Sequence, residues 1–343
     1  LNNMDFSRGN IWILGGPRYS DSYGNLRHMP TLLIENHSLK PYKQRVLGTY
    51  ILLESTIKIL AEEGQTLQEI TKADKALRSA SFPLAWKVPQ MKSAIDYESI
   101  AQLQISNKDA AASDSLLLLG IKSRVQKSSI SHADYITWLG EPETMKVVDY
   151  KATEPIDFIT RPKGYWVPAS CDDVIERLTL HGIKMEIISE AREVKVEMYR
   201  IEDPKIENDS HQPLPYEGHM QVSANTKPEI RNEIFPTGSA YISTDQSLGD
   251  LAIILLEPQS KDSFFSWGFF LSIFQRTEYI EGYVMEPMAK RMLEESPELK
   301  KEFEQKMEQD KVFANDPNAI LTWFYSKTKY YDDRYLLYPV ARE

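Results

Sequence analysis

The sequence predicts an α+β protein built from three parts of different character. Two short apolar runs and a long helical stretch occupy residues 1–79, whereas short apolar segments separated by turn residues follow from residue 80 to about 260. Beyond residue 262 the pattern becomes helical. We therefore expect the C-terminal edge of an α/β domain at 1–79, a β-rich, sandwich-like domain at 80–160, and a mixed β/α domain ending in helices at 161–343.

The composition is that of an ordinary globular protein and excludes several functional classes. Of the 343 residues, 42% are hydrophobic and 26% are charged, with a formal net charge of -10. An acidic chain without a clustered basic surface is a poor nucleic-acid binder, so we expect no nucleic-acid partner. No apolar run reaches the length of a membrane span. The single cysteine, Cys171, excludes an intrachain disulfide and a metal site built from several cysteines.

The first part reads as strand, loop, strand and two helices. Runs of β-type apolar residues predict strands at 11–14 and 31–35. Apolar residues recur every three or four positions from 46 to 60, which predicts a helix, and Gly64 stands where that helix would end. Thr66 and Glu69 have the spacing of a capping box, so a second helix is expected to begin there.

The middle of the chain reads mainly as short strands. One helix interrupts them: Ser170 and Asp173 have capping-box spacing, and Gly182 would end the helix. The unit at 165–188 is therefore expected to be strand, helix, strand. The strand candidates are residues 84–88, 100–105, 116–121, 146–150, 164–167, 183–188, 194–201, 220–222 and 251–256.

The pattern of the last part predicts helices whose apolar faces pack against other apolar residues. Ser296-Pro297 and Asp316-Pro317 each place a capping side chain before a proline suited to the first helical position. The aromatic segment at 264–274 is too apolar to be left in water, and a core helix or a domain-docking face is favoured over a ligand-stacking role.

Self-sufficient catalytic motifs are absent from the sequence. It contains no His-x-x-Glu, His-x-x-x-His, Gly-x-Ser-x-Gly, phosphate-binding loop or dinucleotide fingerprint. The pairs Glu35/His37 and Glu217/His219 each bring a carboxylate near an imidazole. In a strand such pairs share one face, which permits a metal site but is also common by chance.

Two adjacent stretches carry a family resemblance. Residues 15–27 read GGPRYSDSYGNLR and residues 30–42 read PTLLIENHSLKPY. Together they resemble the closing segment of zinc metallocarboxypeptidases of the carboxypeptidase A type. In that family a loop bearing serine and tyrosine leads into a strand whose end presents the catalytic glutamate, and a long helix follows. The resemblance implies that Glu35 is the general base; judged from the strand alone, Glu35 would instead form a salt bridge or face solvent.

The resemblance also implies roles for three residues of the preceding loop. Tyr19 or Tyr23 would be the mobile tyrosine that closes over the substrate, and Arg27 would lie near the substrate carboxylate, where its planar guanidinium suits bidentate binding. The alternatives are loop packing for the tyrosines and a surface ion pair for Arg27.

A second region is similar to a C-terminal extension of some bacterial members of this family. It comprises GYWVPA at 164–169, the helical stretch at 174–183, LLEP at 255–258, WGFF at 267–270 and the ending LYPV at 337–340. The resemblance implies a bacterial protein that is secreted or periplasmic.

The zinc ligands of the family have no counterparts here. They comprise a His-x-x-Glu and a later histidine, all preceding the strand of the base, and the chain enters an apolar segment soon after Leu1 without an initiator methionine. We therefore expect a fragment whose zinc-binding N-terminal segment acts as its intramolecular partner, and which alone neither binds catalytic zinc nor cleaves its peptide substrate near the C-terminus. The alternative is a non-catalytic accessory module that binds a peptide or a glycan.

Overall fold

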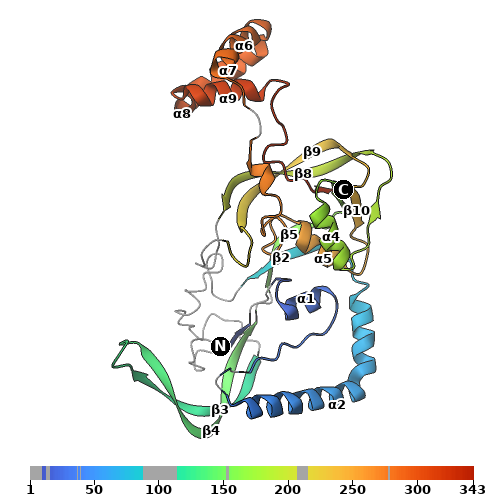
Figure 1. Cartoon of the computed structure of the whole chain (residues 1–343), viewed down its shortest axis with the longest axis vertical. Coiled ribbons are helices and arrows are strands. Elements are labelled where there is room, and N and C mark those ends of the chain that lie inside the picture. The colour runs from blue at the N-terminus through green and yellow to red at the C-terminus, as the bar shows by residue number, and fades with distance from the viewer. Residues whose placement is uncertain are drawn as a thin grey trace.

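The computed structural model describes residues 10–12, 16–36, 38, 40–87, 114–151, 154–206, 215–276 and 279–343. Helices and strands are mixed, as the predicted α+β class requires, and the described strands form three separate sheets. The body, a long helix, a projecting hairpin and a group of C-terminal helices are distinct in Figure 1. The strand expected at 100–105 lies outside the described residues.

A six-stranded antiparallel sheet forms the centre of the protein. Its strand order is β7-β10-β6-β11-β8-β9. The two residues of β11 lie at the end of the chain and pair between β6 and β8, so the last residues are part of the sheet. The strands are β6 (Gly164–Val167), β7 (Glu186–Ile187), β8 (Arg192–Ile206), β9 (Val222–Phe235), β10 (Ala240–Ser243) and β11 (Ala341–Arg342).

Two helices, rather than a second large sheet, cover this sheet. Helix α4 (Asp172–Leu180) and helix α5 (Gly249–Leu256) place apolar residues in the same buried cluster as Tyr165, Val167 and Ile242. The strand predicted at 251–256 is wrong, because these residues form α5. A continuous apolar run fits either a buried strand or a buried helix, and all of Leu251–Leu256 is buried.

The strand-helix-strand prediction for 165–188 is confirmed. Along the chain, helix α4 follows β6 and precedes β7. Gly182 comes shortly after the helix and has a positive φ of 77°, a conformation that favours glycine. The start differs in detail: Cys171 rather than Ser170 is the N-cap, and no side chain caps it.

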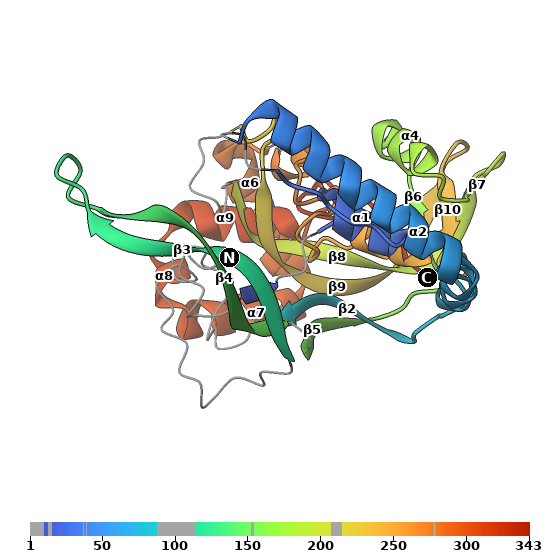
Figure 2. The same cartoon turned by 90° about the horizontal axis from the view of Figure 1, so that it is seen from below.

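Two smaller sheets complete the β structure. β2 (Ser81–Lys87) pairs with β5 (Glu154–Thr160), and Phe82 of β2 is buried in the central core. β3 (Asp114–Lys127) and β4 (Asp134–Lys151) form a long antiparallel hairpin, and β1 (Asn10–Trp12) pairs in parallel with β4. Figures 1 and 2 show the hairpin extending away from the body. The described strands therefore do not stack as two large layers.

The first part of the chain differs from its prediction in two ways. Residues 31–36 form no strand, and Leu32 and Leu33 are 64% and 51% exposed, so no described neighbour pairs with this segment. One continuous helix, α2 (Tyr42–Asp74), replaces the two expected helices, and Gly64 does not end it. Figure 1 shows α2 changing direction partway along. Within α2, Ser55 and Thr56 donate to the carbonyls of the residues four positions earlier.

The C-terminal helices form a small module with its own core. Met285, Phe324 and Tyr325 are buried there, and the module stands apart from the body in Figure 1. Both predicted caps are confirmed, because Ser296 and Asp316 accept hydrogen bonds from main-chain N–H groups of the following turns. The helices are α6 (Gly282–Glu295), α7 (Pro297–Gln309), α8 (Lys311–Ala314) and α9 (Pro317–Ser326).

The aromatic segment at 264–274 contributes to the central core. Phe264, Phe265 and Phe270 are at most 5% exposed, and the segment is built of turns and a 3-10 helix (Leu271–Phe274). Edge-to-face contacts join Phe265 and Phe270 to Tyr338. The core interpretation is confirmed, with turns in place of the expected helix.

Candidate functional site

The segment that contains the predicted site residues is fixed to the body by close glycine contacts. Helix α1 (Ser20–Leu26) follows Gly16, and a Cβ at Gly16 would lie 1.7 Å from Oδ2 of Asp262. A Cβ at Gly24 would lie equally close, 1.7 Å, to Oγ1 of Thr31. Glycine at position 16 therefore allows the segment to lie close to the loop after α5, whereas the Gly24 contact lies within the segment itself.

Asp262 anchors the beginning of this segment. Its carboxylate accepts a hydrogen bond from the Trp267 indole N–H at 3.2 Å and a longer one from the main-chain N–H of Arg18 at 3.5 Å. Burial raises the pKa of Asp262 above its ordinary value, although these donors oppose the shift. Sequence reasoning missed Asp262, because its partner Arg18 is 244 residues away in the chain.

Arg18 lies among aromatic rings beside α1. Its guanidinium carbon lies 4.9, 5.2 and 5.1 Å from the ring centroids of Tyr19, Tyr216 and Trp267. Nη2 donates to the Tyr216 hydroxyl at 3.1 Å and to Oε1 of Glu217 at 2.7 Å. Arg18 therefore joins the N-terminal segment to the turn at 216–219, and sequence reasoning assigned it no role.

Two predicted site residues, Tyr23 and Arg27, lie together against α4. The Tyr23 hydroxyl lies 2.8 Å from Nδ1 of His181, and Nη1 of Arg27 donates to the Tyr23 hydroxyl at 2.9 Å and to the His181 carbonyl at 2.6 Å. Burial, followed by the charge of Arg27, lowers the pKa of His181. With Nδ1 unprotonated, a neutral imidazole accepts a hydrogen bond from the Tyr23 hydroxyl, so hydrogen bonds connect Arg27, Tyr23 and His181.

The other two predicted residues are separate from this cluster. Tyr19 is 49% exposed and contacts the Arg18 guanidinium through its ring. Glu35 is exposed in the irregular segment at 31–36 and has no hydrogen bond or ion pair among the described residues. Its neighbour Asn36 donates to Thr49 of α2 at 2.9 Å. The structure thus groups Tyr23 with Arg27 and leaves Glu35 exposed and apart from them.

Among the residues that the structure describes, neither predicted carboxylate-imidazole pair forms a zinc site. Of the two carboxylate-imidazole pairs, His37 lies outside the described residues, while Glu217 binds Arg18 and the His219 ring packs against Trp267 and Phe269. Among the residues with described placement, no group of three or more His, Cys, Asp or Glu is arranged to hold a metal ion. We therefore derive no step through a metal held by this chain.

The cysteine offers no nucleophile. Burial raises the pKa of Cys171 to about 11, so its thiol stays protonated at neutral pH.

Within the described parts of the chain, no helix combines the length and apolar character needed to cross a membrane. The longest, α2, carries charged residues along much of its length.

Comparisons with known proteins support a carboxypeptidase-like relationship. The chain is 30% identical over 124 residues to "Carboxypeptidase 2" of Trichophyton tonsurans, and equally to that of Trichophyton equinum, in each case over 35% of this chain and 22% of the relative. It is 28% identical over 118 residues to "Probable carboxypeptidase 2" of Arthroderma benhamiae, over 34% of this chain and 22% of the relative. No family model and no solved structure matches the chain. It spans about a fifth of the length of these curated relatives, and over that part it is similar to fungal carboxypeptidases.

Proposed function

We propose that the chain is the C-terminal part of a zinc-dependent metallocarboxypeptidase-like peptidase. It would take part in cleaving peptide bonds near a C-terminus only when a zinc-binding segment outside this chain is present. The observation that carries the proposal is the partial similarity to fungal proteins named carboxypeptidase 2. Residues 1–79 would end the peptidase domain, with residues 80–160 and 161–343 as further domains, and the whole protein would be secreted or periplasmic.

In this proposal Glu35 is the general base. Its carboxylate would take a proton from the attacking water as the new C–O bond forms, and would return that proton to the nitrogen as the C–N bond breaks. An exposed carboxylate without a partner among the described residues is free to face such a water. Zinc, held by the other segment, would supply polarisation of the carbonyl. Tyr19 or Tyr23 would contact the bound peptide, and Arg27 would bind its terminal carboxylate.

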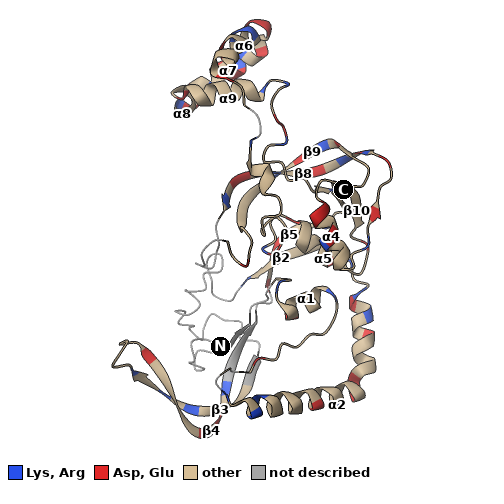
Figure 3. Cartoon of the chain, in the orientation of Figure 1, with Lys and Arg blue, Asp and Glu red and all other residues tan. Residues whose placement is uncertain are grey.

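The surface of α2 supports an additional segment as intramolecular partner. Tyr50, Ile51, Ile57 and Ile59 are 59–66% exposed, and no residue of α2 is buried. Figure 3 shows charged residues spaced along α2, and an uncharged stretch at 46–53 includes Tyr50 and Ile51. Leaving so many large apolar side chains of one helix in water is unfavourable, so a covering segment would stabilise this helix.

The test compares Glu35→Gln with Glu54→Gln in the complete protein that contains this chain. Glu54 is a matched control, because it is an exposed glutamate on α2 whose partner is Lys58 in an i,i+4 pair. Loss of a general base lowers kcat/KM by roughly 10²–10⁴-fold, so Glu35→Gln should fall by that amount and Glu54→Gln should not. Release of C-terminal amino acids from a blocked peptide is the readout. Activity near the wild-type level in Glu35→Gln would remove Glu35 as the base, and peptide binding without any hydrolysis would favour the accessory-module alternative.

A further inference from the structure

The central six-stranded sheet ends in strand β9, whose outer edge pairs with no described strand. The strand order β7-β10-β6-β11-β8-β9 leaves β7 and β9 at the two edges. β7 has 2 residues, whereas β9 has 14. On β9, the side chains of Ile230 and Ile234 are each 63% exposed. A long edge strand with exposed apolar side chains is a template on which another strand can pair.

Contacts of β8 show which main-chain groups of β9 point outward. The carbonyl of Tyr199 on β8 accepts a hydrogen bond from the N–H of Tyr338, so it points away from β9. Tyr199 lies opposite Pro228 of β9. Opposed residues of an antiparallel pair either exchange both hydrogen bonds or exchange none, so the main-chain groups of Pro228 also point away from β8. The same orientation recurs at every second residue of β9, at positions 226, 230, 232 and 234.

Pro228 fits this orientation and leaves most of the edge able to pair. Proline has no N–H, and at an outward position it removes no hydrogen bond between β8 and β9. The N–H groups of Ile230, Asn232 and Ile234 still point outward, as do the carbonyls on this side. Outside the sheet, no main-chain partner for these groups is found among the described residues. The edge therefore keeps the donors and acceptors that a further antiparallel strand needs.

We propose that this edge pairs with β9 of a second copy of the chain, antiparallel and with the two-fold axis at Ile230. In that register Lys227 of one copy lies opposite Glu233 of the other. Glu229 likewise lies opposite Arg231, and opposite charges across two strands stabilise their pairing. Ile230 meets its own counterpart, which removes exposed apolar surface from water. The strand is thus complementary to itself, as an isologous interface requires.

Neighbouring registers place like charges opposite one another. Outward-pointing residues must face outward-pointing residues, so the two strands can shift only by two residues at a time. A shift in one direction centres the pair on Glu229 and places Arg231 opposite Lys227. The shift in the other direction centres it on Arg231 and places Glu229 opposite Glu233. Like charges directly opposite one another are destabilising, so the register centred on Ile230 is preferred to both.

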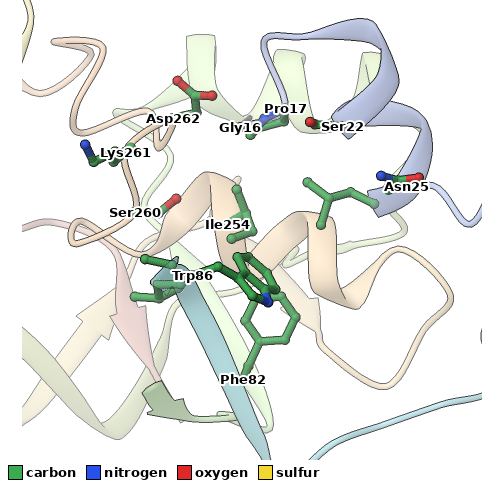
Figure 4. Close-up of a pocket in the computed structure, with 13 residues that line it drawn as sticks. Gly16, Pro17, Ser22, Asn25, Phe82, Trp86, Ile254, Ser260, Lys261 and Asp262 are labelled. Atoms are coloured by element: carbon green, nitrogen blue, oxygen red, sulfur yellow. The ribbon is translucent and has the colours of Figure 1, made fainter. Parts of the chain in front are cut away.

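This pairing goes beyond the proposed peptidase function and does not depend on it. No residue of β9 lines the cleft between α1, β2 and α5 that Figure 4 shows, so substitutions on β9 leave the walls of that cleft unchanged. The predicted site residues Tyr19, Tyr23, Arg27 and Glu35 also lie outside β9. Association can therefore be measured without a substrate, and its failure would leave the peptidase proposal standing.

Sedimentation velocity of the 343-residue chain measures the association directly. We expect a reversible dimer with a dissociation constant on the order of 10 µM, as befits a small interface. Ile230→Lys places two like charges at the two-fold axis and should weaken association about tenfold or more. A wild-type chain that stays monomeric at concentrations up to about 200 µM would overturn the proposal, as would unchanged association of Ile230→Lys.

Ile187→Lys is the matched control for that variant. Ile187 is 52% exposed on β7, at the opposite edge of the same sheet. This variant should associate like the wild type, and an equal loss in both lysine variants would contradict pairing through β9. Thermal unfolding checks that both variants are folded. Should Ile230→Lys fail to fold, cross-linking decides the question.

Cysteine cross-linking tests the register. The two copies of residue 230 are direct neighbours in the dimer, within the Cα spacing of about 4.4–6.8 Å that disulfides allow, so Ile230→Cys should give a covalent dimer on mild oxidation. Residue 232 lies opposite residue 228 of the other copy, which separates the two copies of residue 232 by roughly 13 Å, so Asn232→Cys should not. Both variants carry Cys171→Ser, which removes the single native thiol. Cross-linking through Asn232→Cys, or through neither variant, would overturn the register.

Discussion

The hydroxyl of Tyr23 lies 2.8 Å from Nδ1 of His181, although 158 residues separate them in the sequence. This contact joins α1 to the end of α4, and Arg27 reinforces it by donating to both residues. In the proposed peptidase either Tyr23 or Tyr19 would contact the substrate. His181, at the end of α4, would then help to fix the position of the Tyr23 side chain through this hydrogen bond.

The lowered pKa of His181 predicts a pH-dependent stability. In the unfolded chain the imidazole gains a proton near its ordinary pKa of 6.5, whereas the folded protein takes up that proton only at lower pH. Between these two values the unfolded state binds more protons, so stability falls as the pH decreases below about 7. Urea unfolding at pH 7.5 and 5.5 should show a smaller loss for His181→Gln than for the wild type.

His132→Asn is the control for that experiment. His132 is exposed in the turn of the hairpin at a φ of 58°, which asparagine tolerates. This variant should keep the wild-type dependence on pH, and the same loss of stability in His181→Gln would show that another group titrates.

Replacing Gly16 with alanine should weaken the packing of the segment before α1 against Asp262. The added Cβ would lie 1.7 Å from the Asp262 carboxylate, so either the loop or the segment must shift, at a cost of about 1–3 kcal/mol. Gly48→Ala is the opposite case, because nothing lies within 4 Å of a Cβ there and alanine favours the helix by about 1 kcal/mol. Chemical unfolding and far-ultraviolet circular dichroism would measure the two changes. A neutral effect of Gly16→Ala would mean that the close contact with Asp262 is not maintained in solution.

The buried pair of Glu257 and Arg342 should be sensitive to removal of one partner. Glu257 is 0% exposed, its Oε1 lies 2.9 Å from Nε of Arg342, and it accepts a hydrogen bond from the Tyr165 hydroxyl at 2.6 Å. Arg342→Met would leave the carboxylate buried without its cation, at a cost of about 3–5 kcal/mol. The double variant E257Q/R342M should lose less than the single variant, since the uncompensated charge is gone.

An exposed ion pair supplies the comparison for Arg342. Arg192 and Glu186 form a pair whose side chains are 46% and 52% exposed, so Arg192→Met should change the free energy of unfolding by less than about 1 kcal/mol. Similar losses for both arginine variants would contradict the buried role of Arg342.

Truncation of Ile57 and truncation of Ile242 should destabilise this chain to very different extents. Ile57 on α2 is 66% exposed, so Ile57→Ala should change the free energy of unfolding by at most about 0.5 kcal/mol. Ile242 on β10 is 0% exposed in the central core, so Ile242→Ala should cost about 2–5 kcal/mol. In the complete protein the Ile57 variant should cost more than in the isolated chain, provided that another segment covers α2. An unchanged small cost there would argue against that covering segment.

Local sequence signals determined several elements of this protein by themselves. The caps at Ser296 and Asp316 and the helix ended by Gly182 occur as predicted, because each depends on side chains within a few residues. The strand Gly164–Val167 also occurs as predicted, and it pairs with residues 240–243 and 341–342. Tertiary structure decided the rest. The buried apolar run at 251–256 fits either a strand or a helix by its pattern, and the structure makes it helix α5. Residues 31–35 form no strand, because no described neighbour pairs with them.

The residues of the candidate site also fall into those that the sequence indicated and those that only the fold brings together. The sequence pointed to Tyr23, Arg27 and Glu35 through their local order, whereas only the fold brings His181 to Tyr23 and Asp262 to Gly16. Contacts between residues more than 150 positions apart depend on how separate elements pack. No local spacing encodes them, because burial and close approach are properties of the assembled chain.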